Sequence, residues 1–273
     1  MNETAHGSEA DDAAMPDVQG APDDRRIAIA QVGVRGMRHP IRVRSGDGTV
    51  VSTVATVEMS VSLPHHQKGT HMSRFLAILN EQEDALDRAG LETLVGAVAS
   101  RLEASHARIA FRFPFFRAKS APVSGLVSQM DYEVELVVEG GSAAAAVQLR
   151  VVVPVTTLCP CSKKISAYGA HNQRSHVTIT VSPSGDYWLE DAIDLAERSA
   201  SAELYGILKR ADEKYVTERA YDNPRFVEDL VREVAAGLTD DRRAPSWTVE
   251  VENFESIHNH SAWALVSSDT AGA

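Results

Sequence analysis

Two thiols and two imidazoles fall within eighteen residues of the chain, between Cys159 and His176. Thiolate and neutral imidazole are the preferred ligands of zinc, and a catalytic zinc site uses three protein ligands and leaves one position open. Cys159 and Cys161 taken alone also fit two packed thiols without a ligand, because free cysteine is among the most buried residue types. His171 lies in a polar loop rich in Gly, Asn and Gln, where no periodic core explains a histidine. The segment therefore favours a catalytic metal site.

A pair of histidines, His258 and His260, is expected at a strand edge near the C-terminus. A spacing of two places both side chains on one side of a strand. Imidazole titrates near neutral pH, so one of the two is a candidate proton shuttle. A solvated pair on a polar face is the alternative, since histidine is often partly exposed.

Cations and hydroxyls gather where a helix is expected to begin, near residue 72. Lys68, His71 and Arg74 supply the positive groups, and a helix N-terminus with nearby cations binds phosphate. Ordinary capping by Thr70 or Ser73 is the alternative. Capping explains the hydroxyls but not the concentration of cations.

Carboxylates form two further pairs, Asp212-Glu213 at the expected end of a long helix and Glu228-Asp229 inside the next. A solvated helix face is the usual role of such residues. Physical reasoning alone does not select Glu213 or Glu228 from the 38 acidic residues of the chain.

The formal net charge of −11 argues against non-specific binding to duplex nucleic acid, which needs a basic face. A small anionic substrate is compatible with this charge, because a local group of cations can oppose the sign of the whole chain. The sequence contains no apolar run long enough to span a bilayer, so no membrane partner is expected. The acidic segment 1–24 lacks the features of a signal peptide, which predicts a disordered tail and a cytoplasmic protein.

The elements that must position these residues come in two similar blocks. Alternation of apolar and polar residues from Val51 to Leu63 predicts a long half-buried strand. Because strands and helices do not alternate one by one, we expect an α+β fold with antiparallel sheets and helices on one face, not a parallel doubly wound sheet. Strands are predicted over residues 26–34, 41–43, 51–63, 107–117, 131–138, 147–155, 176–182, 247–254 and 262–267, and helices over 72–80, 85–105, 189–209 and 224–238.

Five groups of residues together resemble the type IB family of GTP cyclohydrolase I. The resemblance extends from about residue 17 to about residue 266. The groups are 68–75, 159–163, 169–175, 212–214 with 226–229, and 255–260.

This resemblance implies a tunnelling fold, built from tandem T-fold modules with antiparallel sheets and paired helices on one face. It implies a first module over 25–157 and a second over 158–267 that carries the metal and catalytic motifs, between the acidic tail over 1–24 and a tail over 268–273. It also implies a homotetramer with active sites at subunit interfaces.

The activity that the resemblance implies is metal-dependent opening of the guanine imidazole ring of GTP by water, which yields 7,8-dihydroneopterin triphosphate and formate. One divalent metal per subunit, Zn²⁺ or Mn²⁺, is expected on Cys159, His171 and Glu213, and a carboxylate in this set suits Mn²⁺. The resemblance gives the catalytic roles to His258 and Cys159.

Chemistry connects these residues. A bound divalent metal lowers the pKa of water to roughly 7, and His258 is expected to protonate the ring nitrogen as a general acid. Glu228 is expected to accept both donors of the guanine edge, which adenine lacks. Lys68, His71 and Arg74 are the candidates for binding the triphosphate.

Two other functions are compatible with the sequence. A nitrile reductase of the same fold would use Cys159 or Cys161 as a nucleophile, without a metal, while a nicotinamide cofactor supplies hydride. A metal-buffering or redox-sensing domain built around the two cysteines would leave Glu228 and the cations of 68–74 without a role. Bound metal, GTP binding and the absence of NADPH turnover separate these possibilities.

Overall fold

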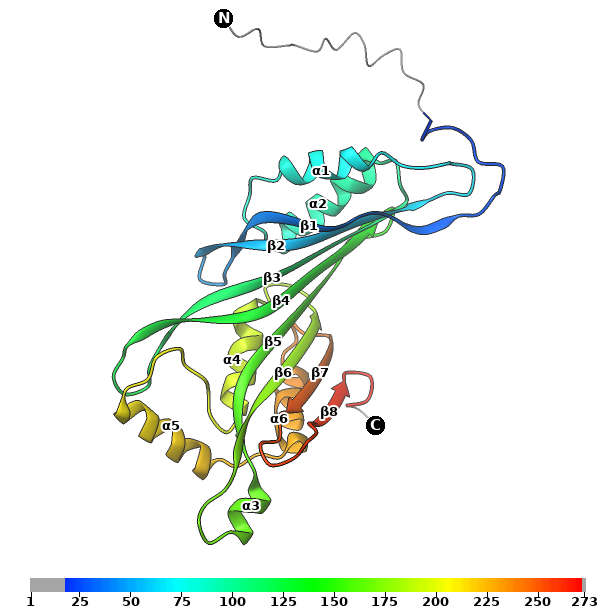
Figure 1. Cartoon of the computed structure of the whole chain (residues 1–273). Helices are drawn as coiled ribbons and strands as arrows, with labels where there is room; N and C mark the ends of the chain where they lie inside the picture. Colours follow the sequence, from blue (N-terminus) through cyan, green and yellow to red (C-terminus); the bar gives the residue numbers. More distant parts are fainter. Residues whose placement is uncertain (1–17, 272–273) are drawn as a thin grey trace, which may run out of the picture.

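Residues 18–271 are described by a computed structural model, in which eight strands form one sheet with the strands side by side in chain order (Figure 1). All neighbouring strands in this part of the chain are antiparallel. The strands are β1 Ile29–Arg44, β2 Val50–Leu63, β3 His106–Ser120, β4 Val127–Gly141, β5 Ala146–Leu158, β6 Asn172–Ser182, β7 Ser246–Asn253 and β8 Ala262–Ser267. The helices are α1 Met72–Asn80, α2 Arg88–Arg101, α3 Pro160–Ile165, α4 Leu189–Ser199, α5 Arg210–Asp222 and α6 Val227–Asp240.

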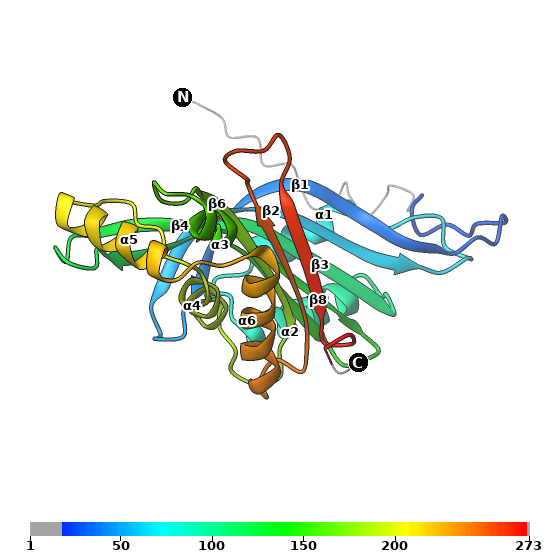
Figure 2. The same cartoon turned by 90° about the horizontal axis from the view of Figure 1, so that it is seen from below.

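One face of the sheet packs on helices and the other is open. Along β4, Tyr132, Val134 and Leu136 are buried, whereas the alternate residues Glu133 and Glu135 lie on the opposite face. Helix α2 contacts β3 and β4, α4 contacts β5, and α6 contacts β7 and β8. Side chains of these three helices belong to one continuous core, and Figure 2 shows α4 and α6 lying against the sheet. An antiparallel sheet covered on one side produces the alternation seen in the sequence, and the predicted α+β class is confirmed.

The order of elements repeats along the chain, as the sequence predicts. Strands β1 and β2, helices α1 and α2, and strands β3 and β4 precede the turn at residues 142–145. Strands β5 and β6, helices α4 to α6, and strands β7 and β8 follow it, with α3 inserted between β5 and β6. A division into modules at residues 157 and 158 falls at the end of β5, and this division remains a prediction.

The helix predicted over residues 189–209 is wrong in its second half. Helix α4 ends at Ser199, and the following chain pairs with the end of β5 instead. The amide of Thr156 donates to the carbonyl of Ala202 at 2.9 Å, and the amide of Ala202 donates back at 3.2 Å. A new helix, α5, begins at Arg210, so Glu213 lies in its first turn and not at the end of a long helix.

Strand β1 is a single element where two short strands, 26–34 and 41–43, are predicted. Its pairing with β2 is irregular between Val34 and Met37, where Gly36 takes a positive φ of 76°. Pro40 is tolerated in this strand because β1 lies at the edge of the sheet.

The predicted acidic tail falls mostly on residues 1–17, which lie outside the described residues, as do residues 272–273 of the predicted C-terminal tail. Residues 19–23 run beside residues 66–69. The amides of Lys68 and Gly69 donate to the carbonyls of Ala21 and Gln19, each at 3.0 Å. The segment before β1 therefore supports the loop that leads to α1. No helix within residues 18–271 is long and apolar enough to cross a membrane.

Candidate active site

Cys159 and His171 lie opposite each other, just beyond the last paired residues of β5 and β6. The amide of Cys159 donates to the carbonyl of His171 at 3.1 Å. Cys159 is also the N-cap residue of α3, and its thiol accepts the amide of Ser162 at 3.5 Å. Pro160 follows at the first position of this helix, where its fixed φ favours a helix start. The structure thus brings together the thiol-bearing and imidazole-bearing residues that the sequence predicts as ligands.

Four buried polar side chains extend from His171 across three strands. His171 Nδ1 lies 3.0 Å from Gln173 Oε1, and Gln173 donates from Nε2 to Thr157 Oγ1 at 2.9 Å. The hydroxyls of Thr157 and Ser175 are 2.8 Å apart, and Ser175 donates to Asn253 Oδ1 at 2.8 Å. We call Gln173, Thr157, Ser175 and Asn253 the polar row.

Sequence reasoning missed the polar row, although a signal for it exists. Along β5, the buried positions that alternate through Val151, Val153 and Val155 continue to Thr157. Those of β6 change from apolar residues to Ser175 and Gln173 towards the site. Buried positions that turn polar at one end of a strand pair indicate a site there, because buried polar groups need partners.

Helix α5 packs beside the Cys159 and His171 positions. Val216 and Ala220 of α5 join Leu158 and Ala170 in a small apolar cluster. The ammonium of Lys163 on α3 lies 4.2 Å from the ring centroid of Tyr221 and donates to the Tyr221 carbonyl. The helix is therefore held against both chain segments that carry the predicted ligands.

Glu213 lies on the same face of α5 as Val216, three residues away. Its side chain is exposed. Within residues 18–271, no three His, Cys, Asp or Glu side chains lie close enough together to hold a metal ion. In this part of the chain the structure therefore brings the Cys159 and His171 positions together without completing a three-residue cluster with Glu213. Glu213 lies on a helix that contacts their neighbours.

Asp212, next to Glu213, is buried and anchors the start of α5. It accepts the amides of Val123 and Ser124, each at 2.8 Å, the Ser124 hydroxyl at 2.7 Å, and the amide of Lys209 at 2.8 Å. Burial acts to raise the pKa of Asp212, but these hydrogen bonds outweigh it and hold the pKa well below the usual range. The ionised carboxylate thus ties α5 to the turn between β3 and β4.

Glu228 is exposed in the first turn of α6. Asp229 caps this helix by accepting the amide of Phe226 at 2.9 Å. The amide of Arg225 donates to the carbonyl of Leu158 at 3.0 Å. The start of α6 is therefore fixed to the residue that precedes Cys159, which places the segment carrying Glu228 beside the predicted ligands.

His258 and His260 lie in the loop between β7 and β8, so their predicted position on a strand is wrong. Their rings nevertheless stack, with centroids 5.2 Å apart and an interplanar angle of 22°. The same loop reaches the site, because Ser256 Oγ lies 3.4 Å from His171 Nδ1. Both histidines are exposed.

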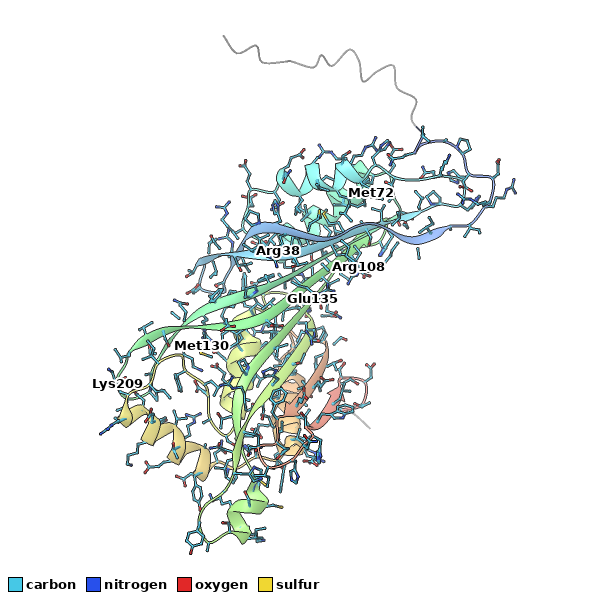
Figure 3. All side chains as sticks on the ribbon, in the orientation of Figure 1. Arg38, Met72, Arg108, Met130, Glu135 and Lys209 are labelled. Atoms are coloured by element: carbon cyan, nitrogen blue, oxygen red, sulfur yellow. The ribbon has the colours of Figure 1, made fainter. Side chains whose placement is uncertain are left out.

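The three residues predicted to bind the triphosphate, Lys68, His71 and Arg74, lie at the start of α1; we call them the phosphate cluster after that prediction. Lys68 and Arg74 are exposed. In Figure 1, α1 and α3 lie at opposite ends of the molecule, and Figure 3 labels Met72, the first residue of α1, at that distant end. One chain therefore does not bring the phosphate cluster to Cys159 and His171.

Solved structures with the same arrangement of elements define the fold class. Uricase from Arthrobacter globiformis superposes with a TM-score of 0.50 at 9% identity, over 87% of this chain and 92% of that chain. A hyper-thermostable mutant of this uricase gives a TM-score of 0.51 at 10% identity, over 89% and 92%. At this identity the likeness concerns the fold alone: the chain is an α+β protein of the tunnelling fold, as the motifs predict.

Sequence comparison places the chain within this class. Residues 15–264 match the family model described as type I GTP cyclohydrolase folE2. GTP cyclohydrolase FolE2 of Paraburkholderia xenovorans is 56% identical over 255 residues, covering 93% of this chain and 95% of the relative. The FolE2 protein of Methylococcus capsulatus is 56% identical over 256 residues, covering 94% and 96%. The chain belongs to the FolE2 family of type I GTP cyclohydrolases, and the resemblance drawn from the motifs is confirmed.

Proposed function

We propose that this protein is a GTP cyclohydrolase I that opens the guanine imidazole ring of GTP with water. The products are 7,8-dihydroneopterin triphosphate and formate, at the first step of tetrahydrofolate and pterin biosynthesis. The observation that carries the proposal is the pairing of Cys159 with His171 at the ends of β5 and β6, in a chain that matches FolE2 proteins over nearly its whole length.

One divalent ion per subunit, Zn²⁺ or Mn²⁺, is held in this proposal by Cys159, His171 and Glu213. The donors fit such an ion, because thiolate and imidazole suit zinc and the added carboxylate makes the set harder and compatible with manganese. The face of α5 that carries Glu213 also carries Val216, which packs on the neighbours of both other ligands. When bound, the ion supplies a water whose pKa is near 7.

The protein's other side chains would bind and protonate the purine. Guanine presents N1–H and an exocyclic amine on one edge, and the two oxygens of Glu228 can accept both hydrogen bonds. His258 would donate a proton to the imidazole nitrogen of the guanine while C8 is attacked. The loop that carries His258 contacts His171 through Ser256, which supports a position for this proton donor near the predicted ligands.

The distant phosphate cluster supports a site shared between subunits. The triphosphate of GTP requires cations, and Lys68, His71 and Arg74 lie at the other end of the chain from Cys159. We infer that the phosphate cluster of one subunit completes the site formed by Cys159 and His171 of another, in a homotetramer.

The deciding experiment is to incubate metal-loaded protein with GTP and to follow both formate release and the fluorescence of the oxidised pterin. A GTP cyclohydrolase I produces both in equal amounts. Consumption of NADPH with a nitrile substrate, without metal, would instead support the reductase. Metal binding without any GTP binding would leave only a metal-buffering domain.

A further inference from the structure

We propose that the polar row, Gln173, Thr157, Ser175 and Asn253, is a one-way chain of hydrogen bonds that fixes the tautomer of His171. The chain keeps a proton on Nδ1 and leaves Nε2 as a free lone pair at the surface of the site. This inference rests on the proposed function in one respect only, since the benefit of a bare Nε2 is its capacity to bind the metal.

The direction of the chain follows from the donors and acceptors. An amide oxygen only accepts, so Gln173 Oε1, 3.0 Å from His171 Nδ1, requires a proton on that nitrogen. The other end of the same amide, Nε2, only donates, and its partner is Thr157 Oγ1 at 2.9 Å. The Gln173 amide therefore keeps this orientation as long as the Thr157 hydroxyl accepts its hydrogen bond.

The hydroxyls of Thr157 and Ser175 can each donate in either direction, so the group at the Asn253 end of the row determines the direction of the hydrogen bonds. Thr157, having accepted from Gln173, donates its own proton to Ser175 across 2.8 Å. Ser175 in turn donates to Asn253 Oδ1 at 2.8 Å. The amide oxygen of Asn253 ends the chain as an acceptor, and each link then points away from His171.

Because the polar row is buried, each of its polar groups needs a hydrogen-bond partner within the protein. Thr157 and Ser175 are fully buried and Asn253 and Gln173 nearly so. With the Gln173 and Asn253 amides oriented as in the structure, reversing or breaking any single link would leave a buried polar group unpaired, which costs much more than a surface hydrogen bond contributes. Packing alone does not require polar residues here, because the next inward positions of β5 and β6, away from the site, hold Val155 and Val177.

The contact of Ser256 with His171 is compatible with this tautomer. Its hydroxyl lies 3.4 Å from the same nitrogen and can accept a share of the Nδ1 proton. Gln173 is the nearer partner, and its amide group is fixed by hydrogen bonds to both His171 and Thr157. Ser256, in contrast, is exposed in a loop. The polar row therefore dominates the choice of tautomer, and its members are positioning residues that act through His171.

The first test compares two identical substitutions of buried serines. Ser175→Ala breaks the chain of hydrogen bonds, and Ser199→Ala removes a buried hydroxyl that donates to the Leu195 carbonyl within α4. Affinity for Zn²⁺ is measured by competition with a chelating dye, and melting temperature is measured on metal-free protein. We expect about 10- to 100-fold weaker Zn²⁺ binding for Ser175→Ala, as is usual when the partner of a ligating histidine is lost. Ser199→Ala should lower only the melting temperature.

Two more variants test direction. Thr157→Val keeps the shape but removes both links, and it should weaken Zn²⁺ binding as Ser175→Ala does. Asn253→Asp keeps an accepting oxygen at the end of the chain, and it should bind Zn²⁺ within about threefold of the parent. Equal Zn²⁺ affinity in the parent, Ser175→Ala and Thr157→Val would overturn the inference.

A direct reading of the tautomer comes from ¹⁵N NMR of metal-free protein labelled at histidine, with the His171 ring assigned by its loss in His171→Ala. The parent should show the proton on Nδ1, and Thr157→Val should show a mixture. A proton on Nε2 in the parent would refute the chain. This measurement needs no metal, so its outcome is independent of the proposed function. If His171→Ala retained its metal, His171 would not be a ligand and the proposed metal site would be wrong, but the tautomer measured by NMR would still stand.

Discussion

The amide of Cys159 donates to the carbonyl of His171 at 3.1 Å. This hydrogen bond extends the pairing of β5 with β6 by one residue pair beyond Leu158 and Asn172. Because the contact is made by the main chain, it persists when either side chain is replaced. Substitutions of these side chains therefore test ligand chemistry with little disturbance of the strand ends.

Replacing Cys159 with Ala should remove metal and activity together. The thiolate is the strongest zinc donor of the proposed set, and its loss leaves two ligands. Metal content by atomic emission and turnover of GTP are measured on the same sample. Cys161→Ala is the matched control, because Cys161 is exposed and is separated from Cys159 by only Pro160, and it should retain both properties. Full metal occupancy in Cys159→Ala would rule out this ligand.

Glu213→Gln should weaken metal binding, since a neutral amide is a poorer ligand than a carboxylate. The matched control is Glu218→Gln on the same helix, where the carboxylate is exposed and pairs with Lys214. Dye competition should give weaker binding for the first variant and no change for the second. Equal affinities would mean that α5 supplies no ligand and that a different third donor completes the site.

Glu228→Gln should lower the affinity for GTP while metal content and folding stay the same. The amide turns one acceptor into a donor that faces the donors of guanine, and an unpaired polar group of this kind costs about 1–3 kcal/mol, or roughly 5- to 150-fold in affinity. Calorimetric titration with a non-hydrolysed GTP analogue measures the effect. Glu233→Gln, exposed on the same helix, is the control; if both variants bind as the parent does, Glu228 does not hold the base.

His258→Ala should reduce turnover by about 10²-fold or more, the usual contribution of a general acid. Metal content and GTP affinity should be unchanged, because His258 is neither a ligand nor a base-binding residue in this scheme. His260→Ala is the natural comparison, since the two rings stack. Loss of metal from His258→Ala would make it a ligand, and an inactive His260→Ala beside an active His258→Ala would exchange the two roles.

Mixed assemblies should reveal whether the site is shared between subunits. Arg74→Ala and Cys159→Ala chains, each inactive alone, should regain activity when co-expressed, because some interfaces then combine an intact phosphate cluster with an intact Cys159. Co-expression of Cys159→Ala with His171→Ala is the control and should stay inactive, since both lesions fall in the same half-site. No recovery in the first pair would place the whole site within one chain.

Local patterns predict most of the sheet. Strand β2, with bounds of Val50–Leu63, agrees with the alternation from Val51 to Leu63 to within one residue. The Cys159 and His171 segments lie next to each other in the structure, and this adjacency is also predictable, because each lies within a few residues of a strand end that its own alternation marks. Their role as ligands remains a prediction. Structural features that depend on only one or two neighbouring elements can therefore be predicted from the sequence.

Features that depend on distant partners are not predictable in this way. The helix predicted through residue 209 stops at Ser199 because Ala202 pairs with Thr156, more than forty residues earlier. The polar row depends on the register of three strands, with Ser175 opposite Asn253. The separation of the phosphate cluster from Cys159 likewise follows from the arrangement of the whole sheet, which carries α1 and α3 at opposite ends of the molecule and which no local pattern encodes.

The pairing of residues 19–23 with 66–69 has a practical consequence for handling the protein. The loop that leads to α1 is held from outside the sheet, by chain that precedes the first strand. Trimming the N-terminus as far as Asp23, a common step before crystallisation, removes the carbonyls that receive the amides of Lys68 and Gly69. We expect such a shortened protein to keep its core but to hold the loop before α1 less firmly. If Lys68, His71 and Arg74 bind the triphosphate as proposed, a trimmed sample should therefore bind nucleotide more weakly than the full chain.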